Sequence, residues 1–283
     1  MDRLETVIFP VAGLGTRMLP ATKVTPKELL PVYDTPLLQF AIDEALAAGA
    51  KRIVLVSHPD KPAIAEYLRH DIALEEKLER SGKHDLLDAV RASRLPEGVT
   101  LSIVMQEEQL GLGHAVLCAA NEVLGDGPVG VILPDDLILG TPCLAEMTRD
   151  YDPSGMKSLV AAQQVPPQNV SRYGIFDCDE SGPDQALPAA RFVEKPDPAV
   201  APSRLAAVGR YILSQEVFDV LRGTGRGAGG EIQLTDAIAA MGSIHAFRFS
   251  GTRHDCGCKD GLVEATLAVQ RQRKRAHLRV AGE

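Results

Sequence analysis

The sequence predicts an α/β protein with a mixed, mostly parallel central sheet and helices on both faces. Short apolar runs rich in β-branched residues indicate buried strands, and amphipathic segments between them indicate helices. The chain has 283 residues, of which 45% are hydrophobic and 24% are charged, as in ordinary globular proteins. A chain of this size can bury about three-quarters of its unfolded surface, so its core needs no disulfide or metal.

Strands and helices alternate along the first half of the chain. Residues 6–11 and 52–57 are apolar runs of strand type, and residues 36–48 place leucine, isoleucine and alanine on one helical stripe. Right-handed crossovers between parallel strands would gather the strand ends, and a ligand site, at one rim of the sheet. The further elements expected here are a helix at 62–69, a helical insertion over 75–96, strands at 100–106 and 129–133, and a helix at 113–124.

In the second half, the connections between strand-like runs are shorter. We expect these strands to extend the same sheet in a partly antiparallel manner rather than to form an independent domain. The expected strands are 158–165, 173–177, 190–193, 206–213 and 244–249, and the expected helices are 215–221, 232–241 and 261–275.

Composition excludes several classes of protein. With 30 basic and 38 acidic residues the formal net charge is −8, and the chain has five Tyr, seven Phe and no Trp. Single-stranded nucleic-acid platforms need stacking rings over a basic groove, so no nucleic-acid partner is expected. No apolar run approaches the roughly 18 residues of a membrane span, and the charged start lacks a signal-peptide pattern. We therefore expect a cytoplasmic protein with no membrane partner.

Two smaller features carry little functional signal. The five cysteines include one close pair, Cys256-Gly-Cys258, which lacks the spacing of a redox motif or zinc site, so reduced thiols are expected. The C-terminal segment carries five cations and no acid between residues 270 and 282, which favours a solvated helix face. These cations are Arg271, Arg273, Lys274, Arg275 and Arg279.

A glycine-rich turn, Ala12-Gly13-Leu14-Gly15-Thr16-Arg17, follows the first strand. Its glycines allow the backbone to approach a ligand closely, but Met18 breaks the dinucleotide fingerprint and no P-loop lysine follows. Arg17 and Lys27 lie on a segment stiffened by four prolines, and two such cations suit a triphosphate. The alternative is a tight turn followed by solvated surface charges.

Acidic residues end two further strand-like runs. Asp135 and Asp136 come at the end of the run at 129–133, where an adjacent acid pair suits Mg²⁺ together with substrate phosphates, and Asp255 is a further candidate ligand. Alternatively, one aspartate simply caps the next turn. Glu194 and Lys195 end another run and could bind sugar hydroxyls and a phosphate, although such a pair is often only an exposed ion pair.

Glycine-led segments open two predicted helices, at residues 111–114 and 229–236. Each is consistent with an anion or hydroxyl site, or with a simple helix cap. His114 lies in the first of them, and because no nucleophile or carboxylate partner is indicated nearby, a structural role is favoured for it.

Taken together, these segments resemble the bacterial UTP–glucose-1-phosphate uridylyltransferases (UDP-glucose pyrophosphorylases) of the sugar-1-phosphate nucleotidylyltransferase superfamily. The resemblance covers nearly the whole chain, and it implies a Rossmann-like three-layer nucleotidyltransferase fold of the glycosyltransferase-A-like type. It also implies a homodimer or homotetramer, and one domain over 1–283 with a nucleotide-binding half (1–135), a sugar-binding half (136–258) and a C-terminal basic helix (259–283). The motifs that carry it are FPVAGLGTRMLPATK, PKELLPV, GLGHAV, LPDD, YGIF, VEKP, APSRLAAVGRY, GGEIQLTDAI and DCGCKDG.

The resemblance also implies a role for each site residue. Cys258 and Leu262 depart from the family pattern, where an Asn and an aromatic residue are expected. The implied nucleotide contacts are Ala12, Gly13, Glu28, Gln106 and Gly111; the sugar contacts are Asp136, Gly174, Glu194 and Lys195; the Mg²⁺ ligands are Asp135 and Asp255; and the catalytic cations are Arg17, Lys27 and Lys195.

The implied reaction joins UTP and glucose 1-phosphate into UDP-glucose and releases pyrophosphate. The attacking phosphate oxygen is already an anion, so we expect neither a general base nor a covalent intermediate, only Mg²⁺ and cations that neutralise charge. Two rival functions stay open: the same reaction with dTTP, and a non-catalytic sensor of sugar nucleotides. A nicotinamide dehydrogenase is disfavoured by the missing third glycine.

Overall fold

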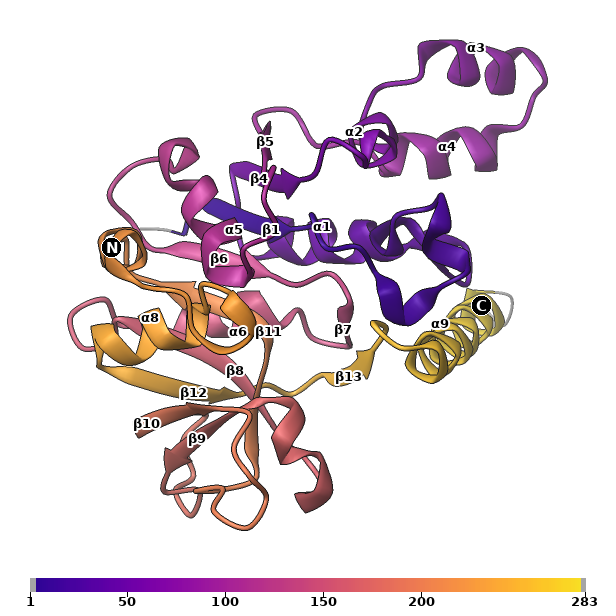
Figure 1. The fold of residues 1–283 in the computed structure, drawn as a ribbon. Helices are drawn as coiled ribbons and strands as arrows, with labels where there is room; N and C mark the ends of the chain where they lie inside the picture. Colours follow the sequence, from indigo (N-terminus) through magenta and orange to yellow (C-terminus); the bar gives the residue numbers. More distant parts are fainter. Residues whose placement is uncertain (1–3, 281–283) are drawn as a thin grey trace.

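The computed structural model describes residues 4–280 and shows one large sheet with helices packed around it (Figure 1). The sheet spans both halves of the chain, so the α/β class is confirmed. Across the described residues the strand order is β5 (Thr100–Met105), β4 (Arg52–Ser57), β1 (Thr6–Pro10), β6 (Val129–Ile132), β11 (Leu205–Leu213), β8 (Ser158–Gln164), β12 (Ile244–Arg248), β10 (Ala186–Glu194) and β9 (Gly174–Cys178).

The sheet is mixed, and its two halves differ. Strands β5, β4, β1 and β6 pair in parallel, as alternating strands and crossovers require. Strand β11 then runs antiparallel to both β6 and β8, and β10 runs antiparallel to both β12 and β9. Strand β12 is parallel to β8, so the C-terminal half is the partly antiparallel extension that the short connections predict. The expectation of a mostly parallel sheet is wrong, because four neighbouring strand pairs of the described sheet are parallel and four are antiparallel.

Side chains of β1 pack alternately into two separate apolar cores, because consecutive strand residues point to opposite sides of the sheet. In β1, Val7 and Phe9 pack with α1 (Leu37–Ala47), α2 (Pro62–Tyr67) and α6 (Cys143–Asp150). Ile8, between them, belongs to a second core with α5 (Leu112–Cys118), α7 (Glu216–Gly223) and α8 (Leu234–Met241). Both cores consist mainly of aliphatic side chains, with a few aromatic and sulfur-bearing ones, and almost all of them are buried.

Three smaller units lie outside these layers. The hairpin of α3 (Ile72–Arg80) and α4 (His84–Ala92) projects from the body and corresponds to the expected helical insertion (Figure 1). The short hairpin of β2 (Pro31–Val32) and β3 (Thr35–Pro36) contacts the long helix α9 (Lys259–Val280). Residues 281–283, the end of the expected basic segment 259–283, lie outside the described residues.

Strands β7 (Asp136–Leu139) and β13 (Thr252–Asp255) and helix α6 are among the elements that were not expected from the sequence. Strand β7 pairs antiparallel with β13, and α6 follows β7. Each strand is only four residues long, which is too short for a periodic pattern to stand out. The expected helix at 113–124 is also wrong at its end: α5 stops at Cys118, and a separate short 3₁₀ turn follows at Ala120–Glu122.

A buried ion pair supports the loop that carries Asp135 and Asp136. Arg210, which is 1% exposed, donates from Nε and Nη2 to the two carboxylate oxygens of Glu44, each at 2.9 Å. Its Nη1 donates to the carbonyl of Leu133 at 3.1 Å, directly before the acidic pair. The guanidinium therefore ties helix α1 and strand β11 to this loop.

We expect Arg210→Met to lower the free energy of unfolding by about 3–5 kcal/mol, because it leaves the Glu44 carboxylate buried and unpaired. Urea unfolding of the two proteins measures this loss. The double variant Arg210→Met/Glu44→Leu should recover much of it, since no buried charge then remains. A single variant as stable as the original protein would contradict the assignment.

Candidate active site

The glycine-rich turn is held against the segment that carries Lys27. Gly15 has φ +65°, a backbone conformation that glycine adopts at no steric cost. A Cβ atom there would lie 3.2 Å from Cβ of Lys27 and 3.3 Å from Cγ2 of Thr22. The Thr22 hydroxyl also donates to the Gly15 carbonyl at 2.8 Å. Gly15 thus permits the close approach that brings both ends of the loop to one place.

Lys27 and Arg17 both face Asp135. Lys27 Nζ donates to Asp135 Oδ2 at 2.6 Å, and Arg17 Nη2 lies 3.8 Å from the same oxygen. Burial by itself would lower the pKa of Lys27, but the carboxylates of Asp135 and Glu28 outweigh it and raise that pKa. Likewise, burial would raise the pKa of Asp135, but Lys27 and Arg17 lower it. Both groups are therefore charged at neutral pH.

Asp255 lies on the same side of the site as Asp135. Strand β13 places Asp255 opposite Asp136, and the Cys256 N–H donates to the Asp135 carbonyl at 2.8 Å. Arg17 Nη1 lies 4.0 Å from Asp255 Oδ1, so one guanidinium touches both candidate metal ligands. The short β7–β13 ladder thus unites acids that are 120 positions apart in the chain.

The two carboxylates form a donor set that fits Mg²⁺ bound together with phosphate. Among the described residues, no group of three or more His, Cys, Asp or Glu side chains could hold a metal alone. Mg²⁺ usually takes one or two carboxylates and completes its shell with water and substrate phosphates. Asp135 and Asp255, linked through Arg17, match this requirement.

A buried ion pair of Lys61 and Glu28 lies next to the end of β1, where the glycine-rich turn begins. Lys61 Nζ donates to the Val11 carbonyl at 2.7 Å and to Glu28 Oε2 at 3.0 Å. Burial raises the pKa of Glu28 and lowers that of Lys61. The second carboxylate oxygen, Glu28 Oε1, has no hydrogen-bond partner among the described residues. An unpaired buried acceptor of this kind is available to a ligand donor.

Gln106 and Gly111 lie beside the same loop. Gln106 Nε2 donates to the Gly111 carbonyl at 3.1 Å and lies 3.0 Å from Nδ1 of His114. Gln109 Nε2 donates to the Ala12 carbonyl at 3.0 Å, which joins this segment to the glycine-rich turn. Four residues expected to bind nucleotide therefore follow the ends of β1 and β5: Ala12, Gly13, Gln106 and Gly111. The fifth, Glu28, lies on the 3₁₀ turn Lys27–Leu29 and is joined to the end of β1 through Lys61.

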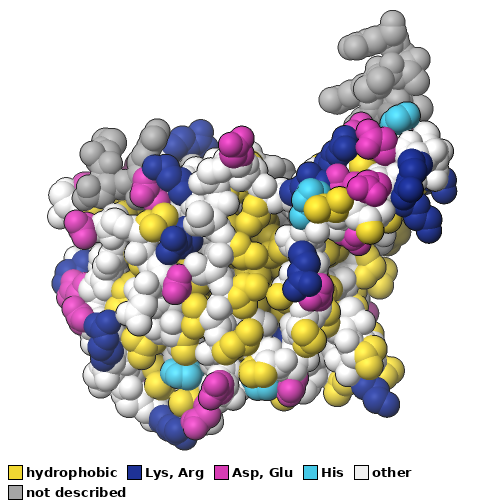
Figure 2. Space-filling view, turned by 90° about the horizontal axis from the view of Figure 1, so that it is seen from above, with side chains coloured by type: hydrophobic (Ala, Val, Ile, Leu, Met, Phe, Trp, Pro, Cys, Tyr) yellow, Lys and Arg dark blue, Asp and Glu magenta, His cyan; other side chains and the backbone are white. Residues whose placement is uncertain are grey.

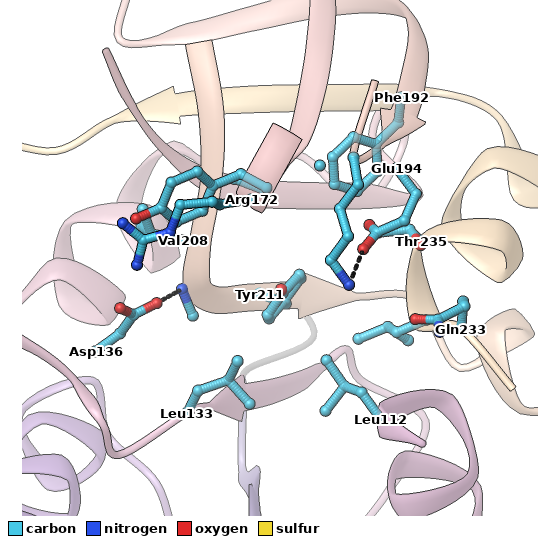
Figure 3. A pocket seen from close by; sticks show the side chains of 16 residues that line it. Leu112, Leu133, Asp136, Arg172, Phe192, Glu194, Val208, Tyr211, Gln233 and Thr235 are labelled. Carbon is cyan, nitrogen blue, oxygen red and sulfur yellow. Dashed lines mark hydrogen bonds and ion pairs between the residues drawn. The ribbon is translucent and has the colours of Figure 1, made fainter. Parts of the chain in front are cut away.

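The four residues expected to bind sugar line one cavity of about 250 Å³. Figure 3 shows Asp136 on one side and Glu194 on the other, with Tyr211 between them. Asp136 Oδ2 accepts from the Gly209 N–H at 2.8 Å, and Lys195 Nζ lies 3.1 Å from Glu194 Oε1. Gly174 and Lys195, the other two residues expected to bind sugar, line the same cavity.

Two backbone features shape this cavity. A Cβ atom on Gly174 would lie 2.5 Å from the ring of Phe192, so only glycine leaves room for that ring. Lys195 has φ +44°, an uncommon conformation for a residue with a side chain, and its N–H donates to the Tyr173 carbonyl at 3.0 Å. Such conformations concentrate at functional sites.

Sequence reasoning singled out Arg17 but not Arg172 or Arg253. Arg253 holds Asp136 through Nε, which lies 2.7 Å from Asp136 Oδ1, and its guanidinium stacks over the Tyr173 ring. Arg172 lines the cavity and lies 3.2 Å from Asp255 Oδ2, so it connects the cavity with the candidate metal ligand Asp255. Both partners are distant in sequence, and no local motif could have revealed these contacts.

The DCG segment tolerates its two departures from the family pattern. The Cys258 thiol donates to the Asp255 carbonyl at 3.1 Å. Leu262 packs against a small core that includes Val32 and Leu137. Neither replacement displaces Asp255 from the position opposite Asp136.

Figure 2 shows how the charged side chains are distributed over one face of the molecule. In Figure 2, acidic and basic side chains alternate over the face shown and do not gather by sign. None of the helices in the described part of the chain is long and apolar enough to cross a membrane.

Comparisons with a family model, with known sequences and with solved structures find relatives of the same kind. The family model described as Nucleotidyl transferase matches residues 7–272. A protein of Escherichia coli (strain K12) named UTP–glucose-1-phosphate uridylyltransferase is 45% identical over 274 residues, which cover 93% of this chain and 89% of that protein. A crystal structure of UDP-glucose pyrophosphorylase complexed with UDP-glucose is 35% identical, with a TM-score of 0.84 over 95% of this chain and 99% of that one. A UTP-bound enzyme of the same kind from Acinetobacter baumannii is 38% identical, with a TM-score of 0.85 over 94% and 93%.

Proposed function

The chain belongs to the UTP–glucose-1-phosphate uridylyltransferase family of nucleotidyl transferases, and we propose that it forms UDP-glucose and pyrophosphate by a single in-line displacement. The observation that carries this proposal is the cluster of Arg17 and Lys27 around Asp135, whose side chain is 16% exposed, beside a cavity lined by Glu194 and Lys195. A triphosphate and a sugar phosphate would meet there.

The main obstacle to the reaction is the repulsion between two polyanions. Arg17 and Lys27 would hold the triphosphate, and Lys195 would hold the phosphate of glucose 1-phosphate at the opposite side. When bound, Mg²⁺ would supply further neutralisation of the phosphate charge between Asp135 and Asp255. These contacts orient the attacking phosphate oxygen toward the α-phosphorus and stabilise the departing pyrophosphate.

The side chains around the site support transfer without a covalent intermediate. Of the described thiols nearby, Cys256 is fully buried, and burial raises its pKa to about 12, so it is not a thiolate at neutral pH. The Cys258 thiol donates to the backbone carbonyl of Asp255. The phosphate of the sugar substrate, already ionised, serves as nucleophile, and no base needs to remove a proton from it.

The proposed contacts to the base and to the sugar come from two different sets of residues. Ala12 and Gly13 offer backbone atoms to the nucleotide, and Gln106 and Glu28 offer hydrogen-bonding groups to uracil, with Gly111 beside it. Asp136, Gly174 and Glu194 would contact the glucose. We further propose that the chain acts in the cytoplasm as a homodimer or homotetramer, as the family resemblance implies.

The test is pyrophosphate release with Mg²⁺ and each combination of UTP, dTTP or CTP with a panel of sugar 1-phosphates. We expect UTP with glucose 1-phosphate to give the highest kcat/KM. A higher kcat/KM with dTTP would transfer the assignment to the thymidylyl reaction. Binding of UDP-glucose without any pyrophosphate release would instead support the sensor function.

A further inference from the structure

The amide of Gln106 has both of its donor hydrogens engaged. Nε2 donates to the Gly111 carbonyl at 3.1 Å and faces Nδ1 of His114 at 3.0 Å. No described residue donates to the amide oxygen, Oε1. The side chain therefore presents an acceptor, and not a donor, as its free group.

The Gly111 carbonyl is one fixed partner of this amide. Gly111 has φ +99°, and a Cβ atom there would lie 2.7 Å from Cβ of Glu231, so neither its conformation nor its surroundings suit another residue. The same carbonyl accepts the first helical hydrogen bond of α5, from the Ala115 N–H at 3.1 Å. A carbonyl can only accept, so the amide atom that faces it must be the nitrogen.

His114 is the second partner, and the contact defines its tautomer. Because the amide nitrogen donates, Nδ1 of His114 must be the unprotonated ring nitrogen. The other nitrogen, Nε2, then carries the hydrogen and lies 3.8 Å from the sulfur of Cys118, one helical turn further along α5. The Cys118 thiol, the His114 imidazole and the Gln106 amide therefore lie in contact in series. The Gly111 carbonyl defines the orientation of the amide, and the amide defines the tautomer of the imidazole.

We propose that His114 is a positioning residue that sets base selectivity by holding Gln106 with Oε1 as the free acceptor. The proposal rests on the proposed function, in which Gln106 meets the pyrimidine. Uracil carries a hydrogen on N3 and can donate to Oε1, whereas cytosine has a lone pair on N3 and would meet it with repulsion. If the Gln106 amide could rotate by half a turn, its NH₂ group would face the base. That group could donate to N3 of cytosine but would be repelled by the N3 hydrogen of uracil.

The test compares kcat/KM for UTP with kcat/KM for CTP, each with glucose 1-phosphate. In His114→Leu we expect the UTP-to-CTP ratio to fall about 10- to 100-fold, mainly through a higher KM for UTP. The KM for glucose 1-phosphate and the kcat with UTP should change less than about threefold, because the residue touches neither reacting group. His114→Asn should restore most of the ratio, since its side-chain oxygen can accept where Nδ1 does.

Several controls separate this role from mere packing. His84→Leu replaces another helical histidine, on the projecting hairpin, and should leave every constant unchanged. If His114→Leu does not fold, His114→Ala provides the same loss of the acceptor. An unchanged UTP-to-CTP ratio in a folded variant, or an equal loss with both nucleotides, would overturn the proposal. Failure of the original protein to release pyrophosphate from UTP would instead overturn the proposed function.

Discussion

Replacing Lys195 with alanine should lower kcat by about 10²–10³-fold, the usual effect of removing one preorganised group that stabilises transition-state charge. Lys195 lines the cavity beside Glu194, and its nitrogen lies 3.1 Å from that carboxylate. The phosphate of glucose 1-phosphate would lose its nearest positive charge. Steady-state kinetics with saturating UTP and Mg²⁺ measure the loss.

The fold should survive this substitution. The Lys195 side chain is 57% exposed, and exposed ion pairs contribute only about 0–1 kcal/mol to stability. Lys157→Ala is the matched control, since Lys157 forms a similarly exposed pair with Glu216 at 2.9 Å but lies outside the site. We expect the control to keep full activity. Near-normal turnover in Lys195→Ala would remove this lysine from the mechanism.

Replacing Asp135 with asparagine should raise the Mg²⁺ concentration needed for half-maximal rate at least about tenfold and lower kcat about 10²–10³-fold. The amide is nearly the same size and keeps an oxygen that can accept from Lys27. The negative charge is lost, however, and both Lys27 and Arg17 then face a neutral group. Mg²⁺ titration of the initial rate measures the change.

Asp179→Asn is the control for this substitution. Asp179 lies in an exposed turn, where its carboxylate accepts from Ser181, and it takes no part in the site. We expect its Mg²⁺ titration to match that of the original protein. If Asp135→Asn also gave an unchanged titration, Asp135 would not be a metal ligand.

Local patterns in the sequence predict much of the fold. The buried strands at 6–11 and 52–57 were predictable because each is a continuous apolar run next to a glycine or a polar turn. The direction of β10 and β11 was not predictable in detail, because it depends on pairing between segments far apart in the chain. Strand β7 was not predicted because it has only four residues. In addition, the acidic residue Asp135 precedes the strand and the acidic residue Asp136 is its first residue.

In the candidate site, too, some contacts could be predicted from local sequence patterns and others could not. Asp135 and Lys27 come from recognisable turns, and their 2.6 Å contact agrees with the expectation that they share one rim. Lys61 lacks any local signal, since its partners Val11 and Glu28 precede it by 50 and 33 positions. His114 was expected to be structural, and its contact with Gln106 could be seen only once the helix start and the end of β5 had been placed together.

The most direct test of the account is the stereochemical course at the α-phosphorus. A UTP analogue of defined configuration, with sulfur in place of one α-oxygen, is converted with glucose 1-phosphate, and the configuration of the thio-UDP-glucose is determined. A single in-line displacement, held by Arg17, Lys27 and Lys195 without a protein nucleophile, predicts inversion. Retention would require two successive displacements through a covalent intermediate, and it would contradict the mechanism proposed for this site.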